Sequence, residues 1–412
     1  MRSLFEADSD EESSVRKHLA ISPVETEVLR TDSPRIHGDH LNQAYQSKRS
    51  QSKIRILVGV VNPQRAGGIF ATEHPFLDEL RRREGVSIAT FPYGGLSGYE
   101  PKLQKTFRLI SDLFRFASAF LRERPDIVHL NSAFDHRALI RDTGYALVAS
   151  VLRAKLFVKY HGSNAGLARN RSGLRRMMTD FVFRSSFRIG VLSSEERANF
   201  LQAGHSEEKV IVVKNAVNVE RFAAPREEPL GAARLLFIGR FIPSKGLLEV
   251  IKAMRIVCDR GFSATLTCIG DGMEMQSAKN LVESLNLSDV VTFGGYVPEP
   301  DTTPYYLSAT MLVMPTRSEG FSMTIFQAVA SGLPVLTTRI RAAADYLAEP
   351  DNCLWIAPGN EEKLAGRIIE VIGNPTLRAQ MSENNRRLAR AFSPEHVVDE
   401  YLAVYNQVLS CK

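Results

Sequence analysis

The sequence predicts an α/β protein made of two successive units, each with a parallel β-sheet flanked by helices. Short apolar runs that fit buried strands alternate with stretches of helical spacing, and this alternation favours parallel sheets. A segment that contains Pro225, Pro229 and Gly231 interrupts the alternation, which then restarts. Of the 412 residues, 44% are hydrophobic and 24% charged, an ordinary globular composition that excludes collagen-like or wholly disordered sequence.

The first unit begins at Lys53, after a polar segment. The run IRILVGVV at 54–61 is almost entirely apolar, as expected of a strand buried on both faces. A helix-like stretch follows to about Arg83. Ser193 and Glu196 have the spacing of a capping box, which predicts a helix start. Further strands are expected at 126–130, 156–160, 188–192 and 210–213.

The second unit follows a boundary at 216–232. Its strands are expected at 235–238, 264–269, 291–293, 311–314 and 334–337, and its helices at 247–260, 273–285 and 324–331. Ser393-Pro394 is typical of a helix start, and apolar residues continue from it at helical spacing. We therefore expect a disordered tail at 1–52, α/β domains at 53–215 and 216–392, and a helix at 393–412 that packs back on the first domain.

Charge and cysteine content narrow the function classes. Lys and Arg number 52 and Asp and Glu 46, a net charge of +6, which favours anionic partners but is too small to predict nucleic-acid binding. The four cysteines have no C-x-x-C spacing, which favours a reducing compartment. The acidic start does not resemble a signal peptide, and no apolar run approaches the roughly 18 residues of a membrane helix. A cytoplasmic location is expected.

The first unit offers two candidate features beyond strand ends, where parallel sheets bind ligands. Gly67-Gly68 follows the first strand, and its bare backbone either approaches a phosphate or forms a tight turn. His161 follows the strand at 156–160. A histidine at this position can hydrogen-bond a substrate hydroxyl or stabilise developing charge. The alternative is a purely structural hydrogen-bonding role.

The second unit offers two cations. Arg240 follows the strand at 235–238, and Lys245 lies just before a helix. Both suit a pyrophosphate, and cations near a helix start are unfavourable unless an anion is present. The alternative is two exposed cations. Gly270-Asp271-Gly272 lacks the third glycine of a dinucleotide fingerprint, so a simple turn suffices there.

Glu319 precedes the helix at 324–331, whose free N–H groups form an anion site. A carboxylate beside that site can bind sugar hydroxyls while the amides hold phosphate. Gln327 lies a little over two turns deeper, and its amide both donates and accepts. It could therefore reach a ribose.

These stretches together resemble family 4 of the retaining glycosyltransferases, which have the GT-B fold of two Rossmann-like domains with parallel sheets facing an inter-domain cleft. The similarity covers about residues 53–409 and is carried by 58–68, 159–163, 239–246 and 319–334. The resemblance implies transfer of a sugar from a nucleotide-diphosphate sugar, UDP- or GDP-linked, to a glycan or lipid-linked glycan. It implies no metal and no cofactor besides the donor, which is a substrate.

The resemblance also implies roles for residues. Arg240, Lys245 and the helix amides would grip the diphosphate, Glu319 would hold sugar hydroxyls, and His161 would touch the donor sugar; these four side chains are the expected catalytic set. The leaving phosphate would accept the acceptor's proton. The expected donor-binding positions are Gly67, Gly68, Arg240, Lys245, Tyr296, Val297, Glu319, Gly320, Phe321, Ser322, Met323 and Gln327.

The sequence departs from the family pattern at several positions. A second glutamate is usual where Gln327 stands, and a Gly-Gly pair is usual where Arg341-Ala342 stands. Asp345 replaces a common glutamate, and Asn215-Ala216-Val217-Asn218 replaces a usual Asn-Gly-Val-Asp. A catalytically weakened relative that acts as an accessory subunit is therefore the alternative. A nicotinamide oxidoreductase is disfavoured by the missing third glycine, and a nucleotide-sugar epimerase fits the Glu319 motif less well.

A basic amphipathic stretch at 102–124 bears on the acceptor. It mixes phenylalanines and leucines with lysines and arginines, and a second basic cluster holds Arg169, Arg171, Arg175 and Arg176. Such features suit peripheral docking to anionic lipid. A crossover helix that buries one apolar stripe and leaves its charges in water explains the same pattern. The oligomeric state is left open.

Overall fold

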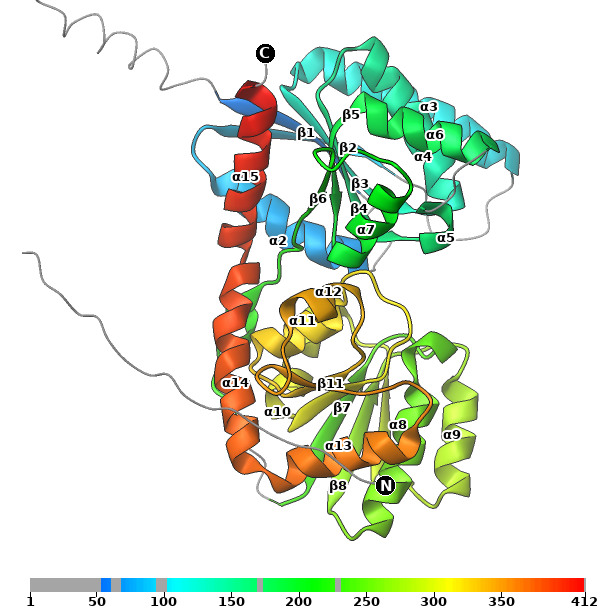
Figure 1. Cartoon of the computed structure of the whole chain (residues 1–412), viewed down its shortest axis with the longest axis vertical. Coiled ribbons are helices and arrows are strands. Elements are labelled where there is room, and N and C mark those ends of the chain that lie inside the picture. The colour runs from blue at the N-terminus through cyan, green and yellow to red at the C-terminus, as the bar shows by residue number, and fades with distance from the viewer. Residues whose placement is uncertain (1–52, 61–67, 94–101, 169–172, 227–230, 411–412) are drawn as a thin grey trace, which may run out of the picture. The chain divides into compact units, whose positions relative to one another are not determined.

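The computed structural model describes residues 53–60, 68–93, 102–168, 173–226 and 231–410. These residues form two six-stranded sheets with helices packed around them (Figure 1), which confirms the predicted α/β fold. By their contacts, residues 52–412 form one compact unit, and we call the parts around its two sheets the first lobe and the second lobe. The tail expected at 1–52 lies outside the described residues.

The first lobe contains the sheet β2-β1-β3-β4-β5-β6, in which every pair is parallel. The long apolar runs of the sequence supply its buried central strands, whereas β2 at the sheet edge is only partly buried. The elements are β1 (Ile54–Val60), α2 (Gly68–Arg82), β2 (Val86–Pro92), α3 (Lys102–Glu123), β3 (Ile127–Phe134), α4 (His136–Val151), β4 (Leu156–Ser163), α5 (Ala165–Ala168), α6 (Gly173–Ser185), β5 (Ser186–Val191), α7 (Ser194–Gln202) and β6 (Val210–Val212).

The second lobe contains the parallel sheet β12-β11-β10-β7-β8-β9. The short helix η1 (Val219–Phe222) precedes it. The elements are β7 (Ala233–Ile238), η2 (Pro243–Lys245), α8 (Leu247–Asp259), β8 (Ala264–Ile269), α9 (Met275–Ser284), β9 (Val291–Gly295), η3 (Glu299–Thr302), α10 (Thr303–Ser308), β10 (Met311–Met314), α11 (Met323–Ala330), β11 (Val335–Thr337), α12 (Arg341–Tyr346), β12 (Cys353–Trp355) and α13 (Glu361–Gly373).

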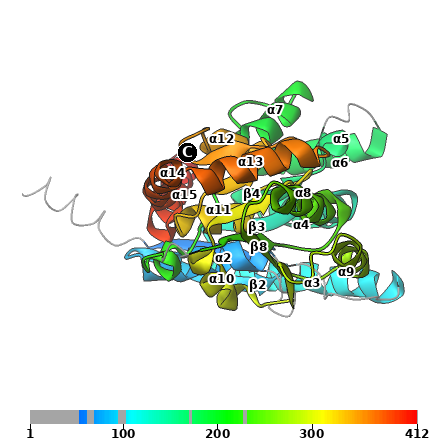
Figure 2. The same ribbon diagram turned by 90° about the horizontal axis from the view of Figure 1, so that it is seen from below.

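Alternation along β7 shows how the second sheet is buried. Leu235 and Phe237 belong to one core cluster together with residues of α8 and α13. Leu236 and Ile238 belong to another core cluster with residues of α10 and α11. Because successive strand residues point to opposite faces, helices cover both sides of this sheet. Figure 2 shows α8 and α13 close together, and the two helices are in contact.

The chain returns to the first lobe through its last helices. α14 (Pro375–Ala389), η4 (Arg390–Phe392) and α15 (Pro394–Ser410) follow one another along one side of the unit (Figure 1). α15 packs against α2, and the Tyr405 hydroxyl lies 2.7 Å from Nδ1 of His129 on β3. Lys155 donates to the carbonyl of Val408. These contacts tie the end of the chain to the first sheet.

A direct connection between the lobes forms at α12. Arg341 has a φ of 41°, and its guanidinium donates to the Ser163 carbonyl (2.8 Å) and to Glu196 Oε1 (3.2 Å). The Ser194 N–H donates to Asp345 Oδ2 (2.6 Å). The two departures from the family pattern at 341 and 345 therefore both bind the first lobe. None of the described helices has the length and hydropathy needed to span a membrane.

Candidate active site

A cavity of about 940 Å³ lies at the carboxyl ends of β7, β8 and β9 and beside the first turns of α11. The strand order of the second sheet changes direction between β7 and β10, and open parallel sheets bind ligands beyond such a point. The lining comes from both lobes and the segment between them. It comprises His74, Pro75, Asp78, Asn218, Arg221, Ile238, Gly239, Arg240, Ile269, Gly270, Asp271, Tyr296, Val297, Pro298, Glu299, Pro300, Thr302, Met323, Thr324 and Gln327.

The glycines after β7 and β8 form part of this lining. A Cβ built on Gly270 would lie 1.9 Å from the carbonyl oxygen of Gly239, so the two turns touch backbone to backbone. Gly270 also has a φ of 139°, which favours glycine. Close approach of two turns therefore explains the Gly-x-Gly pattern at 270–272 without a dinucleotide fingerprint.

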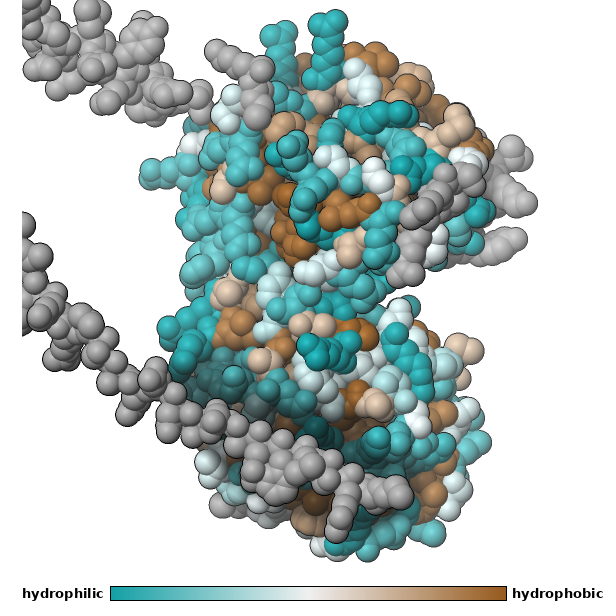
Figure 3. Space-filling model, in the orientation of Figure 1, coloured by the Kyte–Doolittle hydropathy of each residue, from teal (hydrophilic) through white to brown (hydrophobic). Residues whose placement is uncertain are grey.

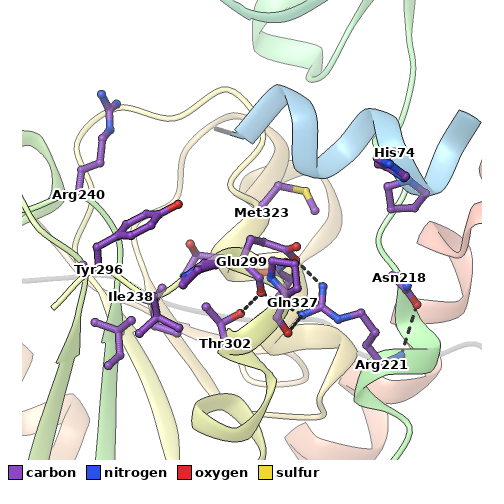
Figure 4. A pocket seen from close by; sticks show the side chains of 18 of the residues that line it. His74, Asn218, Arg221, Ile238, Arg240, Tyr296, Glu299, Thr302, Met323 and Gln327 are labelled. Carbon is purple, nitrogen blue, oxygen red and sulfur yellow. Dashed lines mark hydrogen bonds and ion pairs between the residues drawn. The ribbon is translucent and has the colours of Figure 1, made fainter. Parts of the chain in front are cut away.

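Arg240 and Tyr296 lie at the exposed margin of the cavity. The Arg240 side chain is exposed and forms no ion pair with another described residue. Figure 4 shows it extending away from the cluster of Glu299, Gln327 and Arg221. Tyr296 is 65% exposed. A free guanidinium and a free aromatic ring on one cavity suit an anionic, ring-containing ligand.

The first turn of α11 presents backbone donors. Ser322 precedes the helix in an extended conformation, and its side chain makes no capping hydrogen bond, so the first N–H groups are left for a ligand or water. Met323 and Thr324 line the cavity. Phe321 stacks on Phe326 with ring centroids 4.0 Å apart, which fixes the start of the helix. This end of α11 is therefore suited to an anion.

Lys245 and Glu319 lie beside this helix start and form an ion pair with each other. The side chains are 10% and 16% exposed, and neither is among the residues that line the cavity. The structure thus brings together the cation expected at the diphosphate and the carboxylate expected at the sugar. Each side chain neutralises the charge of the other.

Gln327 is 4% exposed and forms part of a polar network in the cavity wall. Its amide nitrogen donates to Glu299, and its amide oxygen accepts from the Tyr306 hydroxyl (3.1 Å). Arg221 donates to the same glutamate (2.6 Å). Figure 4 shows Arg221, Glu299 and Gln327 converging in the wall of the cavity.

His161 belongs to a buried ionic cluster of the first lobe. Its Nε2 lies 3.1 Å from Glu73 Oε1 and 3.2 Å from Asn131 Oδ1, so Nε2 carries the proton that both oxygens accept. Lys159 donates to the same Glu73 oxygen (3.0 Å). Burial, followed by the Lys159 charge, lowers the pKa of His161, while Glu73 opposes the shift. The ring is therefore a neutral, oriented donor.

The main chain of His161 contacts the second lobe. A Cβ built on Gly320 would lie 2.8 Å from the His161 carbonyl oxygen and 3.0 Å from Gly162 Cα. Only a residue without a side chain fits there, and this explains the glycine after Glu319. The contact places the loop with Glu319 against the end of β4. The side chain of His161 itself is 4% exposed, and its contact with a donor sugar stays a prediction.

Sequence reasoning missed several residues that the fold brings to the site. Glu299 and Arg221 were not expected, and neither were Glu73 and Lys159. Their partners are distant in the sequence, so no local pattern marks them. Gly67 lies outside the described residues, and Gly68 is the first residue of α2. Among the described residues, no group of three or more His, Cys, Asp or Glu side chains could hold a metal ion.

Comparison with known families agrees with this arrangement. Residues 54–216 match the "Glycosyl transferase 4-like domain" model, and residues 218–388 match the "Glycosyl transferases group 1" model. The two matches meet between the two sheets and together include every described strand of both. The chain is a glycosyltransferase with the GT-B fold.

Individual relatives carry the same description. An uncharacterized glycosyltransferase of Methanocaldococcus jannaschii is 28% identical over 287 residues, which are 69% of this chain and 76% of that one. A lipopolysaccharide core biosynthesis glycosyltransferase of Rhizobium meliloti is 28% identical over 180 residues, 43% of this chain and 51% of that one. The chain therefore spans about half the length of the second relative.

A solved structure supports the fold. HepE of Anabaena, in complex with UDP and glucose, superposes with a TM-score of 0.66 at 16% identity, covering 86% of this chain and 99% of that one. At this identity the likeness concerns the fold alone.

Proposed function

We propose that this glycosyltransferase moves a sugar from a nucleotide-diphosphate sugar, UDP- or GDP-linked, to a glycan or lipid-linked glycan. The observation that carries the proposal is the cavity on the second sheet. It combines an exposed arginine, Arg240, with a helix start and an exposed aromatic ring, Tyr296. These are the partners that a diphosphate and a base require. The UDP held by the structurally similar HepE supports the same class of donor.

The reaction needs stabilisation of the departing diphosphate. The bond from the sugar C1 to the phosphate oxygen breaks, a bond from C1 to the acceptor oxygen forms, and the acceptor's proton passes to a phosphate oxygen. In this proposal Arg240, Lys245 and the first N–H groups of α11 hold the developing negative charge, which preorganised donors do effectively. Departure and attack on one face retain the anomeric configuration. No metal takes part.

The ion pair of Lys245 and Glu319 gives both residues a role in donor binding. Both side chains are largely buried, so each compensates the charge of the other. When the donor binds, Lys245 turns to the diphosphate and Glu319 accepts hydrogen bonds from the sugar hydroxyls. The donor thereby replaces the ion pair with an ionic contact to Lys245 and hydrogen bonds to Glu319.

An exposed face of the first lobe supports an acceptor at an anionic membrane. α3 buries Phe116 but leaves an apolar stripe exposed on the other side, formed by Phe107, Ile110, Phe114 and Leu121. The expectation that a crossover helix buries one apolar stripe accounts for Phe116 but not for this second, exposed stripe. The adjacent α4 and α6 add exposed apolar residues, namely Ile140, Leu147, Val151, Leu174 and Met177.

Basic side chains accompany these stripes, which we call the apolar-basic face. Arg115 and Arg122 are 64% and 73% exposed, and Arg137, Arg153 and Arg175 are exposed as well. Figure 3 shows brown and teal residues mixed along the edge where Figure 1 places α3, α4 and α6. Apolar residues among cations are typical of peripheral binding to anionic lipid. The name of the Rhizobium relative, lipopolysaccharide core biosynthesis, fits an acceptor at such a surface.

Turnover of donor tests the proposal. A panel of UDP- and GDP-sugars is incubated with the whole chain and with glycan and lipid-linked glycan acceptors, and release of the nucleotide diphosphate is measured. We expect turnover of at least one donor, and a loss of roughly a hundredfold or more in kcat for Lys245→Ala, the scale seen when a transition-state donor is removed. Lys252→Ala is the control, because Lys252 is a half-exposed lysine of α8 paired with Glu361.

The outcomes separate the parts of the proposal. If folded Lys245→Ala keeps the wild-type rate, the diphosphate assignment is wrong. If no donor in the panel is consumed, the proposed reaction is wrong. The configuration of the new glycosidic bond, read by NMR, tests retention, and an inverted product would contradict the single-face mechanism.

A further inference from the structure

Glu299 has an unusual position in the cavity wall. Its Oε1 accepts from Arg221 Nη1 (2.6 Å) and from the amide of Gln327, whereas its Oε2 accepts from no other described residue. The side chain is 35% exposed and lines the cavity. The carboxylate is thus fixed at one oxygen and open to a ligand at the other.

Three backbone and side-chain contacts make this position rigid. Besides its bond to the carboxylate, Arg221 donates to the carbonyls of Glu299 (3.0 Å) and Pro300 (2.9 Å) and to Thr303 Oγ1 (2.9 Å). The segment after β9 is therefore held on the linker helix η1. A carboxylate held in this way needs little further ordering when it binds a ligand.

The orientation of Gln327 follows from its partners. An ionised carboxylate only accepts hydrogen bonds, so the amide nitrogen, not the oxygen, faces Glu299. The Tyr306 hydroxyl then donates to the amide oxygen. Both polar atoms of Gln327 are thus engaged within the protein, and the side chain is 4% exposed. Gln327 has little left to offer a ligand directly.

The other carboxylates of the lining are less suited to bind a neutral hydroxyl. Asp78, on α2, is bonded to His74 (2.9 Å) and Arg81 (3.0 Å) of its own helix. Asp271 accepts from the N–H of Gly272 in its own turn (2.7 Å) and is exposed. Glu299 alone among these three lies next to both Tyr296 and the first turns of α11, between the sites proposed for the base and the diphosphate.

We propose that Glu299 is the carboxylate that accepts hydrogen bonds from the ribose hydroxyls of the donor nucleotide, and that Gln327 is the positioning residue that aims it. The inference rests on the proposed function, because it needs a nucleotide in this cavity. A carboxylate is well matched to the hydroxyls of a ribose. The family pattern usually has a second glutamate where Gln327 stands, and in this proposal Glu299 supplies the carboxylate from the opposite side of the cavity wall.

This arrangement predicts that a glutamate at position 327 weakens recognition of the ribose. In Gln327→Glu two carboxylates would stand in hydrogen-bond contact with no proton between them, and like charges at that distance repel. Glu299→Gln leaves two amides and no carboxylate. The double variant Gln327→Glu/Glu299→Gln exchanges the two groups and again gives one carboxylate facing one amide.

The test measures dissociation constants by calorimetry for the wild type and these three variants of the full chain. The probes are UDP and 2′,3′-dideoxy-UDP, or the guanine pair if the wild type binds GDP. We expect wild type to prefer the ribose form by roughly ten- to a hundredfold, the scale of hydrogen bonds to a charged group. Each single variant loses most of this preference, and the double variant regains most of it.

A matched control separates this role from simple electrostatics. Removing a negative charge near a diphosphate should strengthen binding by Coulomb's law, so weaker binding of UDP by Glu299→Gln has the opposite sign. Asp271→Asn removes the same charge from the same cavity and should keep the ribose preference. Thermal melting of each variant confirms that it is folded.

The outcomes distinguish a failure of this inference from a failure of the proposed function. If UDP or GDP binds and Glu299→Gln keeps the full ribose preference, the role of Glu299 is wrong while the proposed function stands. If Gln327→Glu binds better than wild type, the positioning role of Gln327 is wrong. If no nucleoside diphosphate binds wild type, both this inference and the proposed function fail.

Discussion

His129, Glu73, Lys159 and His161 lie together in the first lobe, and none of their side chains is more than 7% exposed. Glu73 carries the negative charge of this cluster: although burial raises its pKa, Lys159 and His161 together hold that pKa far below the usual range. His129 contacts the Tyr405 hydroxyl of α15 through Nδ1, while its buried Nε2 has no partner among the described atoms. A proton added to His129 would therefore be poorly accommodated.

The folding stability should accordingly depend on pH through His129. Burial lowers the pKa of His129 to about 3, with Glu73 opposing the shift, whereas an unfolded histidine has a pKa near 6.5. Because the folded pKa is the lower one, its contribution to stability is complete above about pH 6.5 and is lost as the pH falls toward about 3. We expect the melting temperature to fall between pH 7 and pH 5.

His129→Gln tests this assignment. Its melting temperature should fall less steeply over the same pH interval, although burial also lowers the pKa values of His161 and His205, so some slope remains. Glu73 does not contribute above about pH 4.5, because its unfolded form is already ionised there. Equal slopes in the variant and the wild type would show that His129 does not carry the effect.

Side chains at the site differ in how far the sequence could predict them. Arg240 and Gly239 follow an apolar strand directly, and topology alone puts them at a ligand-binding edge. Glu299 follows a strand by four residues, but its role in the site depends on its hydrogen bonds to Gln327, 28 positions away, and to Arg221, 78 positions away. Such pairs arise from tertiary packing, which no local pattern records.

At the scale of elements, the sequence predicts the helices and strands that have a strong hydrophobic pattern and misses those whose pattern is weak. The strands of continuous apolar residues, such as β1 and β10, and the capped helix α7, whose Ser193 accepts from Glu196 N–H, were predicted. The edge strand β2 is mostly half-buried or exposed and lacks a continuous apolar run, and β12 has three residues, so neither gives a clear signal. α3 was readable as an amphipathic helix, but a sequence cannot tell which of two apolar stripes faces the core.

The exposed stripe of α3 leads to a prediction about lipid. The double variant Phe107→Ser/Phe114→Ser removes two side chains that are 76% and 73% exposed, so it should leave the fold intact. We expect it to reduce co-sedimentation with vesicles that contain phosphatidylglycerol by at least severalfold, because buried apolar area drives such binding. Vesicles of phosphatidylcholine alone should bind both proteins weakly.

Met273→Ser is the matched control for the lipid experiment. Met273 is 80% exposed but belongs to the second lobe, away from the apolar-basic face. Its loss should leave vesicle binding unchanged. Binding that survives in the double variant, or that falls equally in the control, would contradict a membrane role for the apolar-basic face.

At the scale of the whole molecule, specific contacts add to a shared hydrophobic cluster where the two lobes meet. Arg341 bonds to Ser163 and Glu196, Asp345 bonds to Ser194, and Gly320 lies against His161. All of them lie near the carboxyl ends of the strands, where the cavity is. The same contacts that join the lobes therefore bring the end of β4 to the loop that carries Glu319.

The account as a whole depends on phosphate recognition in the cavity of the second lobe. The exposed Arg240, which forms no ion pair with another described residue, and the open start of α11 supply positive potential there. A nucleoside without phosphates cannot use these groups. The difference between a nucleoside and its diphosphate thus measures the contribution of this part of the site.

Calorimetric titration of uridine, UDP, guanosine and GDP into the wild type and Arg240→Ala tests this most directly. We predict that one diphosphate binds wild type at least tenfold more tightly than its own nucleoside, and that Arg240→Ala removes most of that advantage while leaving nucleoside binding unchanged. Equal binding of nucleoside and diphosphate by wild type, or an advantage that Arg240→Ala keeps in full, would contradict the account.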